Sequence, residues 1–217
     1  MGKGLKVEII CIQSVDSTHT FMCDKIRSKE IDKELAIYAL NQNNGVGSRD
    51  NEWQSKPGNL HLNFCLKQSS LVADLPLNSI SIYFGFLMKS VLNKNGSKVW
   101  LKWPNDIYLD DKKVGGLISA KIDDFIVVGI GLNLKYAPPY ATVLDIDIGL
   151  EDLIQEYLKE IEKKISWKLI FRNYIVEFEK SRAYKVHLHG REYSLQEASL
   201  YEDGSILLEN KRMYNLR

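Results

Sequence analysis

A polar, glycine-bearing segment over residues 42–53 holds several side chains that could do chemistry. It reads Gln-Asn-Asn-Gly-Val-Gly-Ser-Arg-Asp-Asn-Glu-Trp. Its two glycines allow a ligand to approach the backbone closely, and successive backbone N–H groups can bind anionic oxygens. Arg49 offers a fixed fork of donors for a phosphate or a carboxylate, and Trp53 offers a flat face for a base. A solvated surface loop with one packed tryptophan is the alternative interpretation.

Two further segments combine polar side chains with glycines in the middle of the chain. Residues 102–107 read Lys-Trp-Pro-Asn-Asp-Ile, and a proline inside a strand marks a bulge or an edge where side chains are re-aimed. The same Pro-Asn-Asp run is also ordinary turn chemistry. Residues 113–116 and 129–133 then place paired glycines in strand-like sequence. Such glycines weaken a strand unless something approaches its backbone, so a ligand site is indicated, although Lys113 alone could be a solvated hairpin lysine.

Generic catalytic and binding motifs are mostly missing. The sequence contains no G-x-x-x-x-G-K-[ST] phosphate loop and no G-x-S-x-G nucleophile motif. Residues 45–50 begin like a dinucleotide fingerprint but lack its third glycine and its strand-turn-helix setting. His187 and His189 would share one face of a strand, yet no third ligand stands nearby, so exposed strand histidines fit better than a metal site. No metal ligands are assigned.

The composition excludes several classes of protein. With 217 residues, 45% of them hydrophobic, and a net charge of +1, the chain is globular and not disordered. The balance of 29 Lys and Arg against 28 Asp and Glu argues against a polybasic nucleic-acid binder, so we expect no nucleic-acid partner. The most apolar run, residues 80–92, is too short to cross a bilayer and contains Lys89, so we expect no membrane partner.

The cysteines and the N-terminus indicate the cytoplasm. Cys11, Cys23 and Cys65 stand far apart, with no Cys-x-x-Cys and an odd count, which favours reduced thiols over a disulfide framework. The first ten residues lack the apolar stretch and the small-residue cleavage site of a signal peptide. We therefore expect a cytoplasmic protein.

The elements that must hold these residues can be predicted from hydrophobic periodicity. Strands are expected over residues 5–15, 59–66, 99–109 with an interruption at 104–106, 114–122 and 125–134. The alternation in residues 59–66 indicates a half-buried strand. Helices are expected from a cap at residues 16–18 to Arg27, over residues 77–94, and over 150–180 in two pieces. Residues 33–42 fit a strand or a helix equally well.

These elements predict an α+β fold. Neighbouring strands between residues 99 and 134 form a meander that is best paired antiparallel, in a mixed or antiparallel sheet with packed helices. After Arg182, short strands and turn signals indicate a small all-β module. We therefore expect a catalytic domain over residues 1–180 and a β domain over residues 181–217.

In order and spacing, the motifs closely resemble the signature of the biotin protein ligases. The resemblance rests on residues 102–107, Lys113-x-x-Gly116, Gly129-x-Gly131-x-Asn133, Val15-Asp16-Ser17-Thr18 and a G-x-G loop that ends in Trp53. It spans nearly the whole chain, because the C-terminal β module is similar to the small SH3-like β-barrel of that family. It implies the fold of the class II synthetases and the biotinyl and lipoyl ligases.

The resemblance implies a two-step, ATP-dependent reaction. The biotin carboxylate attacks the α-phosphate of ATP, giving biotinyl-5′-AMP and pyrophosphate, and a lysine of a biotin carboxyl carrier protein then takes the biotinyl group. Neither step needs a covalent enzyme nucleophile, which agrees with the missing triad motifs. Positioned cations must offset the repulsion between carboxylate and phosphate. Mg²⁺ on the ATP phosphates is expected to supply most of the remaining neutralisation.

The resemblance also assigns roles to individual residues. Lys113 and Arg49 are the implied catalytic cations. The implied biotin-binding residues are Ser17, Thr18, His19, Gln42, Gly45, Val46, Gly47, Ser48, Lys113 and Gly116. The implied nucleotide-binding residues are Trp53, Lys102, Asn105, Asp106 and Asn133. Burying the polar ureido ring of biotin is costly unless its donors and acceptors are matched, which suits small hydroxyl and amide side chains.

The sequence departs from the family pattern in the 42–53 segment. That loop is usually arginine-rich, G-R-G-R-x-G-R-x-W, whereas Val46, Ser48 and Asn51 stand at the arginine positions here and Arg49 remains. Our hypothesis is that this loop holds the biotinyl adenylate less tightly than an arginine-rich one. His19 stands where the family commonly has Asn. Sixteen residues precede Ser17, so the resemblance is to ligases without an N-terminal DNA-binding domain.

Two other functions stay open at this point. A lipoate ligase or octanoyltransferase would share the fold but should lack the 102–107 run. A catalytically weak biotin-binding module would agree with the loss of loop arginines, although Lys113 argues against it. Members of the family often dimerise through sheet edges, so a homodimer is a further implication.

Overall fold

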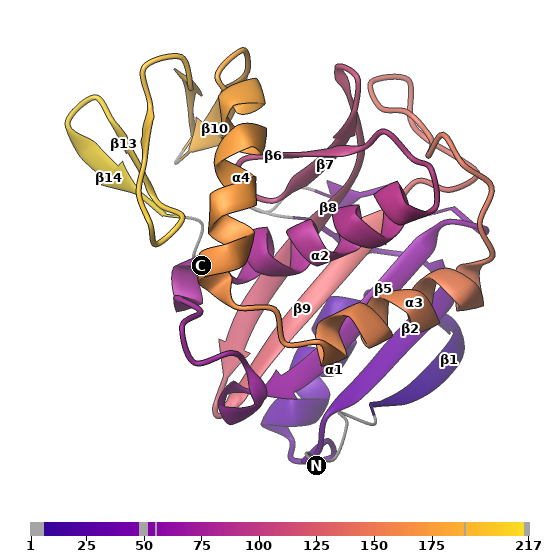
Figure 1. Cartoon of the computed structure of the whole chain (residues 1–217). Coiled ribbons are helices and arrows are strands. Elements are labelled where there is room, and N and C mark those ends of the chain that lie inside the picture. The colour runs from indigo at the N-terminus through magenta and orange to yellow at the C-terminus, as the bar shows by residue number, and fades with distance from the viewer. Residues whose placement is uncertain (1–6, 48–51, 55, 189, 215–217) are drawn as a thin grey trace.

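One mixed sheet forms the centre of the protein (Figure 1). The computed structural model describes residues 7–47, 52–54, 56–188 and 190–214. Within these residues, the central sheet has seven strands, in the order β1 (Glu8–Val15), β2 (Leu35–Gln42), β5 (Leu60–Lys67), β9 (Phe125–Leu132), β8 (Lys112–Ile122), β7 (Asp106–Leu109) and β6 (Trp100–Lys102). Strands β1 and β2 are parallel, and every other neighbouring pair is antiparallel. The expected α+β class and the antiparallel meander are confirmed.

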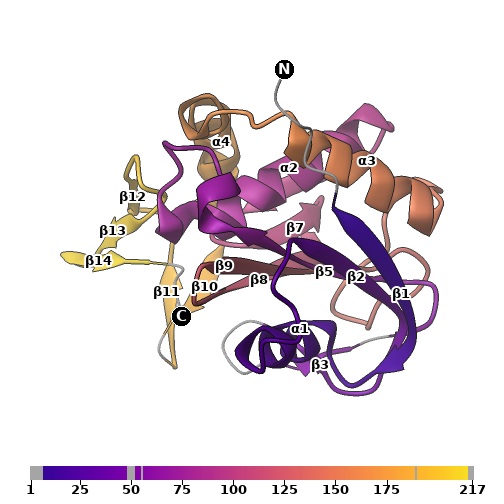
Figure 2. The same ribbon diagram turned by 90° about the horizontal axis from the view of Figure 1, so that it is seen from below.

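Helices cover both faces of this sheet (Figure 2). Helices α2 (Ile80–Lys94), α3 (Leu150–Glu162) and α4 (Trp167–Ser181) lie on one face, and α1 (Thr18–Arg27) lies on the other. The larger hydrophobic core fills the space on the α2 side. A smaller cluster beneath α1 joins Met22, Cys23 and Ile26 of the helix to Leu35, Ile37, Cys65 and Val127 of the sheet.

Strand β5 is buried on both faces, which corrects the expectation of a half-buried strand. Its first seven residues are all buried. Leu60, Leu62 and Phe64 belong to the core on the α2 side, whereas His61 and Asn63 face the α1 side. Alternation of apolar and polar residues normally indicates one solvated face. Here α1 covers that face, so the polar residues lie inside the protein.

Most predicted elements are confirmed, with shifts at their ends. The ambiguous residues 33–42 form strand β2, and the predicted helix over 77–94 begins with the 3₁₀ helix η3 (Leu77–Ser79) before α2. Ser17 caps α1, because its hydroxyl oxygen accepts from the backbone N–H of Thr20 at 3.3 Å. Ser166 caps α4 in the same way and divides the long amphipathic stretch into α3 and α4. The expected strand over 99–109 is divided into β6 and β7 by residues 103–105, which include a cis Trp103–Pro104 bond.

The polar segment after β2 folds back as a short hairpin. Strands β3 (Gly45–Val46) and β4 (Glu52–Trp53) pair antiparallel, with Gly45 opposite Trp53. Figure 2 shows β3 beside α1, on the same side of the sheet. We call the described residues of this segment, 43–47, 52–54 and 56–58, the pocket hairpin.

The chain ends in a small β region that packs on the rest of the molecule. Its described residues form a two-stranded sheet, β10 (Lys185–Leu188) with β11 (Arg191–Ser194), and a three-stranded sheet, β12 (Ser199–Leu200), β13 (Ile206–Leu208) and β14 (Lys211–Met213). The predicted small C-terminal β domain is thus present as small sheets. Val186, Leu195 and Ile206 belong to the larger hydrophobic core, and the predicted boundary at 180/181 stays a prediction.

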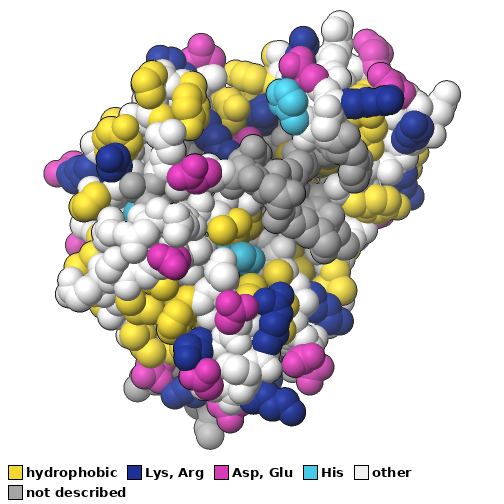
Figure 3. Space-filling view, turned by 180° about the vertical axis from the view of Figure 1, so that it is seen from behind, with side chains coloured by type: hydrophobic (Ala, Val, Ile, Leu, Met, Phe, Trp, Pro, Cys, Tyr) yellow, Lys and Arg dark blue, Asp and Glu magenta, His cyan; other side chains and the backbone are white. Residues whose placement is uncertain are grey.

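None of the helices in the described residues combines the length and the apolar character that a membrane span requires. The face that carries α1 shows basic and acidic side chains mixed across its surface (Figure 3).

Candidate functional site

Cross-strand pairing aligns the motifs in one row across the α1 side of the sheet. Residues directly opposite each other in neighbouring strands share a face. Lys102 of β6 lies opposite Asp106 of β7, Asp106 opposite Gly116 of β8, Gly116 opposite Gly131 of β9, and Gly131 opposite His61 of β5. The row therefore runs from an ion pair, across two glycines, to a histidine.

A pocket lies over the glycines of this row and of the next. In that second row, Ile118 of β8, Gly129 of β9 and Asn63 of β5 are aligned. Because the glycines carry no side chains, the sheet surface is open between the flanking residues. The pocket is lined by Ser17, Thr18, His19, Gln42, Val46, Gly47, Trp53, His61, Asn105, Lys113, Gly116, Leu117, Ile118, Gly129, Ile130 and Gly131.

One end of the pocket carries a set of hydroxyl and amide groups. The Gln42 Oε1 atom accepts hydrogen bonds from the Thr18 backbone N–H at 2.7 Å and from the Thr18 hydroxyl at 3.0 Å. Ser17, Thr18 and Gln42 are all buried. The two bonds from Thr18 orient the Gln42 amide, with its oxygen toward the start of α1. These residues come from the start of α1 and the end of β2.

His19 and Asn63 form the floor beside this polar end. The Asn63 Nδ2 atom lies 3.0 Å from His19 Nδ1, and His19 Nε2 lies 3.8 Å from Cys23 Sγ. A Cβ atom on Gly129 would come within 2.9 Å of Asn63 Nδ2 and 3.3 Å of His19 Nδ1. Gly129 is therefore needed for this contact between helix and strand.

Two lysines flank one carboxylate at the other end of the pocket. Lys113 Nζ lies 2.6 Å from Asp106 Oδ1, and Lys102 Nζ lies 3.8 Å from Asp106 Oδ2. Side-chain exposure is 33% for Lys113 but only 8% for Lys102. Two cations on one anion leave a net positive charge that favours an anionic ligand. Lys113 is the cation with room to reach that ligand.

A β-bulge brings Lys113 to this face. Lys113 and Gly116 are three residues apart, so in a regular strand they would point to opposite faces. The register shifts between Ile107 and Tyr108, where Lys113 lies opposite Tyr108 and Gly115 lies opposite Ile107, so β8 has one extra residue. A Cβ atom on Gly116 would lie 3.3 Å from Lys113 Nζ, which places the ammonium above that glycine.

The Trp53 ring lies against the sheet surface at Gly131. A Cβ atom on Gly131 would come within 2.5 Å of this ring, and Lys113 Nζ lies 6.0 Å from the ring centroid. Gly131 is therefore required by the tryptophan as well as by the open sheet surface. Trp53 and Lys113 meet at the pocket although sixty residues separate them in sequence.

Asn105 and Asn133 are hydrogen-bonded within the chain. Asn105 lines the pocket, but its Nδ2 atom donates to the carbonyl of Leu117 at 2.6 Å, so it also holds β8. Asn133 is 2% exposed, its backbone N–H donates to Val114 at 2.8 Å, and its Nδ2 atom donates to Thr142. Asn133 therefore lies beside the Lys113 strand and outside the pocket lining.

The predicted site residues thus divide into groups. Those that line the pocket are Ser17, Thr18, His19, Gln42, Val46, Gly47, Trp53, Asn105, Lys113 and Gly116. Those that lie next to the lining are Gly45, Lys102, Asp106 and Asn133. Ser48 and Arg49 lie outside the described residues.

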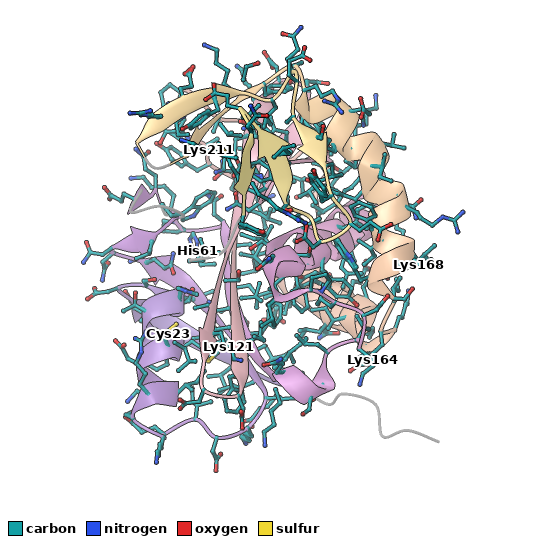
Figure 4. The ribbon with its side chains drawn as sticks, turned by 90° about the vertical axis from the view of Figure 1, so that its left-hand side faces the viewer. Cys23, His61, Lys121, Lys164, Lys168 and Lys211 are labelled. Carbon is teal, nitrogen blue, oxygen red and sulfur yellow. The ribbon has the colours of Figure 1, made fainter. Side chains whose placement is uncertain are left out.

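His61 and Asn63 are pocket-wall residues that sequence reasoning missed. Both alternate with the leucines of β5. The signal available in the sequence was this pair of polar residues at neighbouring positions of one strand face. His61 is 1% exposed, its Nε2 atom lies 3.4 Å from the carbonyl oxygen of Lys56, and burial lowers the pKa of its imidazole, which favours the neutral form. Figure 4 shows His61 and Cys23 on the α1 side of the sheet.

The described residues gather no three His, Cys, Asp or Glu side chains that could hold a metal ion. His187 is 77% exposed and lies 3.8 Å from Glu192, as expected for an exposed strand histidine. His189 lies outside the described residues.

Residues 11–134 match the model of the biotin/lipoate A/B protein ligase family. A solved structure from Helicobacter pylori, described as a biotin acetyl-coenzyme A carboxylase synthetase with bound biotinylated ATP, is 36% identical and superposes with a TM-score of 0.92. The superposition covers 96% of this chain and 100% of that one. A biotin protein ligase from Aquifex aeolicus in complex with biotin and ATP is 22% identical, with a TM-score of 0.70 over 95% of this chain and 94% of that one, and shows the shared fold.

Curated relatives match over shorter stretches. The bifunctional ligase/repressor BirA of Escherichia coli is 36% identical over 129 residues, which are 55% of this chain and 38% of that protein. A biotin–[acetyl-CoA-carboxylase] ligase of Mycobacterium tuberculosis is 35% identical over 77 residues, 31% of this chain and 29% of that protein. The match thus covers less than two fifths of either relative.

Proposed function

This chain belongs to the biotin/lipoate A/B protein ligase family, and we propose from that premise that it is a biotin protein ligase. It would activate biotin with ATP to form biotinyl-5′-AMP and then transfer the biotinyl group to one lysine of a biotin carboxyl carrier protein or domain. The observation that carries this proposal is the polarity of the pocket. Hydroxyl and amide groups lie at one end, glycine backbone and apolar side chains in the middle, and Lys113 at the other end.

This order of groups matches biotin along its length. The ureido ring needs donors and acceptors, which Ser17, Thr18 and Gln42 would supply. The fused rings and the aliphatic chain need close apolar contact, which Ile118 and the backbone of Gly116 would supply. The carboxylate needs a cation, which Lys113 would supply. Val46, Gly47 and His19 would close the sides of the pocket, together with Gly45 and, as the family resemblance implies, Ser48.

The first step joins two anions, and the lysine cluster would lower its barrier. A biotin carboxylate oxygen forms a bond to the α-phosphorus of ATP, and the bond from that phosphorus to the bridging oxygen breaks with release of pyrophosphate. Lys113 would hold the carboxylate and then the α-phosphate. Asp106 would keep the Lys113 ammonium in place through its 2.6 Å contact, and Lys102 would offset the charge of Asp106. Arg49 is proposed as a second cation, because the family resemblance implies that role.

In the second step the carrier lysine attacks the acyl carbon of the mixed anhydride. An amide bond forms, the bond to the phosphate oxygen breaks, AMP leaves, and the amine loses a proton. The enzyme would act mainly by positioning. Trp53, Asn105 and Asn133 are proposed to position the nucleotide part of the intermediate.

Mg²⁺ would enter on the ATP phosphates and neutralise part of their charge. The described part of the chain brings together no three His, Cys, Asp or Glu side chains that could hold the ion. This agrees with a metal that is bound mainly by the substrate. Phosphate oxygens would then be its main ligands, and Asp106, which faces Lys113 and Lys102, would act on the lysines.

One assay separates this proposal from its alternatives. Purified protein is incubated with ATP, an apo carrier domain and radiolabelled biotin or lipoate. Label on the carrier with biotin alone supports the ligase. Label with lipoate would favour the lipoate ligase alternative, and no label with either acid would favour an inert biotin-binding module.

Oligomeric state and compartment remain separate proposals. Strand β1 is an edge strand of the sheet and exposes Ile9 and Ile10. We propose a homodimer that forms through this edge. Sedimentation of the full chain at several concentrations would test it. The cytoplasmic location and the expected lack of nucleic-acid and membrane partners stay predictions from composition.

A further inference from the structure

The buried side chain of Asn59, just before β5, binds the first residues of the loop that follows β9. Asn59 is 1% exposed. Its Oδ1 atom accepts hydrogen bonds from the backbone N–H groups of Leu134, Lys135 and Tyr136, each at 3.0 Å, and its Nδ2 atom donates to the carbonyl of Tyr136 at 2.8 Å. An amide side chain offers an acceptor oxygen with two lone pairs and a separate donor nitrogen, so it can bind several groups of one stretch of backbone. Asn59 therefore fixes the path of the chain where it leaves β9.

The loop that Asn59 holds is bonded to the strand of the catalytic lysine. The backbone N–H of Asn133 donates to the carbonyl of Val114 at 2.8 Å, and that of Thr142 donates to the carbonyl of Lys113 at 2.9 Å. Leu144 in turn donates to the carbonyl of Asn133. Residues 133–144 thus run beside Lys113, and Asn59 anchors their first turn.

The same asparagine closes the base of the pocket hairpin. The Asn59 backbone N–H donates to the carbonyl of Lys56 at 3.2 Å, and Lys56 Nζ lies 5.6 Å from the ring centroid of Tyr136. Gly58 has a φ of +89°, and a Cβ atom there would lie 3.2 Å from Lys135 Cγ. Trp53 lies on this hairpin five residues before Gly58. The hairpin and the 133–144 loop are therefore interlocked at Asn59.

We propose that Asn59 is a positioning residue for ATP, which sets the 133–144 loop and the Trp53 end of the pocket hairpin in register around the nucleotide end of the site. This inference rests on the proposed function. It separates the two substrates, because the polar end of the pocket is held by the bonds between Thr18 and Gln42. The start of the hairpin, which would contact biotin, is held by backbone bonds from Asn43 and Asn44 to the carbonyls of Val15 and Asp16. Loss of the Asn59 amide should weaken ATP binding and leave biotin binding nearly unchanged.

The test compares three variants of the full chain. Asn59→Ala removes all four side-chain hydrogen bonds, whereas Asn59→Asp keeps an acceptor for the three backbone N–H groups. Asn95→Ala is the matched control, because Asn95 donates to Val91 and Glu156 at the end of α2, on the other side of the sheet from the pocket. Two readouts are used: KM for ATP and for biotin in adenylate formation, and calorimetric Kd for a non-hydrolysable ATP analogue and for biotin.

For Asn59→Ala we expect the KM and Kd on the ATP side to rise at least about tenfold, which is the effect of losing about 1.4 kcal/mol. The biotin values should change less than about twofold. Asn59→Asp should recover most of the ATP affinity, and Asn95→Ala should alter the melting temperature only. A purely structural role would reduce the active fraction, and hence kcat, with both KM values unchanged.

The outcomes separate this inference from the proposed function. A wild-type protein that binds both ligands but transfers no label would overturn the ligase proposal, while calorimetry would still decide the role of Asn59. Equal losses of ATP and biotin affinity in Asn59→Ala, or no loss of either, would overturn the positioning role. If Asn59→Ala does not fold, a normal ATP Kd in a well-folded Asn59→Ser variant, which lacks the amide, would overturn it as well. Wild-type protein that binds neither ligand would overturn both proposals.

Discussion

At the scale of single residues, the site depends on how charge is held around Asp106. Its carboxylate contacts Lys113 at 2.6 Å and Lys102 at 3.8 Å. Lys102 is nearly buried and its Nζ atom lies 5.1 Å from the ring centroid of Tyr108, so aromatic rings and a carboxylate surround this ammonium. Lys113 is the more exposed of the two lysines. In our proposal, Lys113 therefore binds the ligand and Lys102 stabilises the Asp106 carboxylate.

Replacing Lys113 should affect the first chemical step most strongly. We expect Lys113→Ala to slow adenylate formation by about 100-fold or more, because a positioned charge at the reacting oxygens is lost. Pyrophosphate exchange with ATP and biotin measures this step directly. Lys112→Ala is the control, since Lys112 is exposed on the same strand and should retain wild-type exchange. Exchange near the wild-type rate in Lys113→Ala would contradict the role assigned to this lysine.

At the scale of elements, the glycines of β8 and β9 form the sheet surface over which the site's side chains meet. Gly116 of β8 and Gly131 of β9 are direct partners, and Trp53 occupies the surface of Gly131. A methyl group on Gly131 would come within 2.5 Å of the indole, closer than such contacts allow, so the tryptophan or the strand must move.

Gly131→Ala should therefore displace Trp53. We expect a change in tryptophan fluorescence and a loss of adenylation of about 100-fold, the size of effect that a shift of about 1 Å in a positioning group can cause. A double variant that also changes Trp53 to Ala should lose little further activity, because both changes remove the same contact. Unchanged fluorescence and activity in Gly131→Ala would show that the ring does not depend on this glycine.

Local sequence patterns predicted the elements better than they predicted how residues meet. Helix α1 followed from the cap at Ser17, and β8 and β9 followed from their apolar runs, because these signals are local. The burial of His61 and Asn63 could not be read from β5 alone, since it depends on α1 covering that face. The place of Lys113 depends on one extra residue in β8, and a bulge has no clear local signature.

Besides Ser166, a residue far away in the sequence also caps α4, and its contribution should respond to pH. Asp74 accepts hydrogen bonds from the backbone N–H groups of Trp167 and Lys168, both at 3.0 Å. Burial would raise the pKa of the Asp74 carboxyl, but the bonds from Lys168 and Trp167 outweigh it and lower that pKa below its usual value. A lowered pKa in the folded state stabilises the protein above the unfolded pKa of about 3.9, and this stabilisation is lost as the pH falls through the folded value.

Asp74→Asn should lower the free energy of unfolding at pH 7 by about 1 kcal/mol, as expected for loss of a cap. The difference in melting temperature from the wild type should shrink below about pH 4, where the wild-type carboxyl is also becoming neutral. Thermal unfolding followed by circular dichroism between pH 3 and pH 7 gives both values. Asp32→Asn, at an exposed position, serves as the control and should track the wild type. A constant difference across this pH range would exclude the titration of Asp74 as its cause.

At the scale of the whole molecule, a turn of the C-terminal β region at residues 202–204 is hydrogen-bonded to the rest of the chain. The indole nitrogens of Trp103 and Trp167 donate to the carbonyls of Gly204 and Glu202, and the Ser79 hydroxyl donates to the carbonyl of Asp203. Trp103 belongs to the Lys-Trp-Pro-Asn-Asp run, so the motif that holds Asp106 also contacts the end of the chain. The β region should therefore unfold together with the catalytic part and not as an independent unit.

Two glycines with nearly the same backbone conformation provide a matched test of this contact. Gly204 and Gly190 have φ values of +73° and +74°, so alanine is strained equally at both. A Cβ atom on Gly204 would meet Ser79 Oγ at 2.5 Å and Ile82 Cδ1 at 2.9 Å, whereas nothing lies within 4 Å at Gly190. The difference between the two variants therefore isolates the packing of the turn against η3 and α2.

We expect Gly204→Ala to lose about 1–3 kcal/mol more unfolding free energy than Gly190→Ala, the usual cost of an added methylene in a packed interior. Urea denaturation followed by far-ultraviolet circular dichroism and by tryptophan fluorescence should give one coincident transition for each variant, because the β region and the catalytic part share a core. If fluorescence and circular dichroism instead gave two separate transitions, residues 181–217 would unfold on their own. The predicted domain boundary would then mark an independent folding unit, and the turn at residues 202–204 would be a contact between two domains.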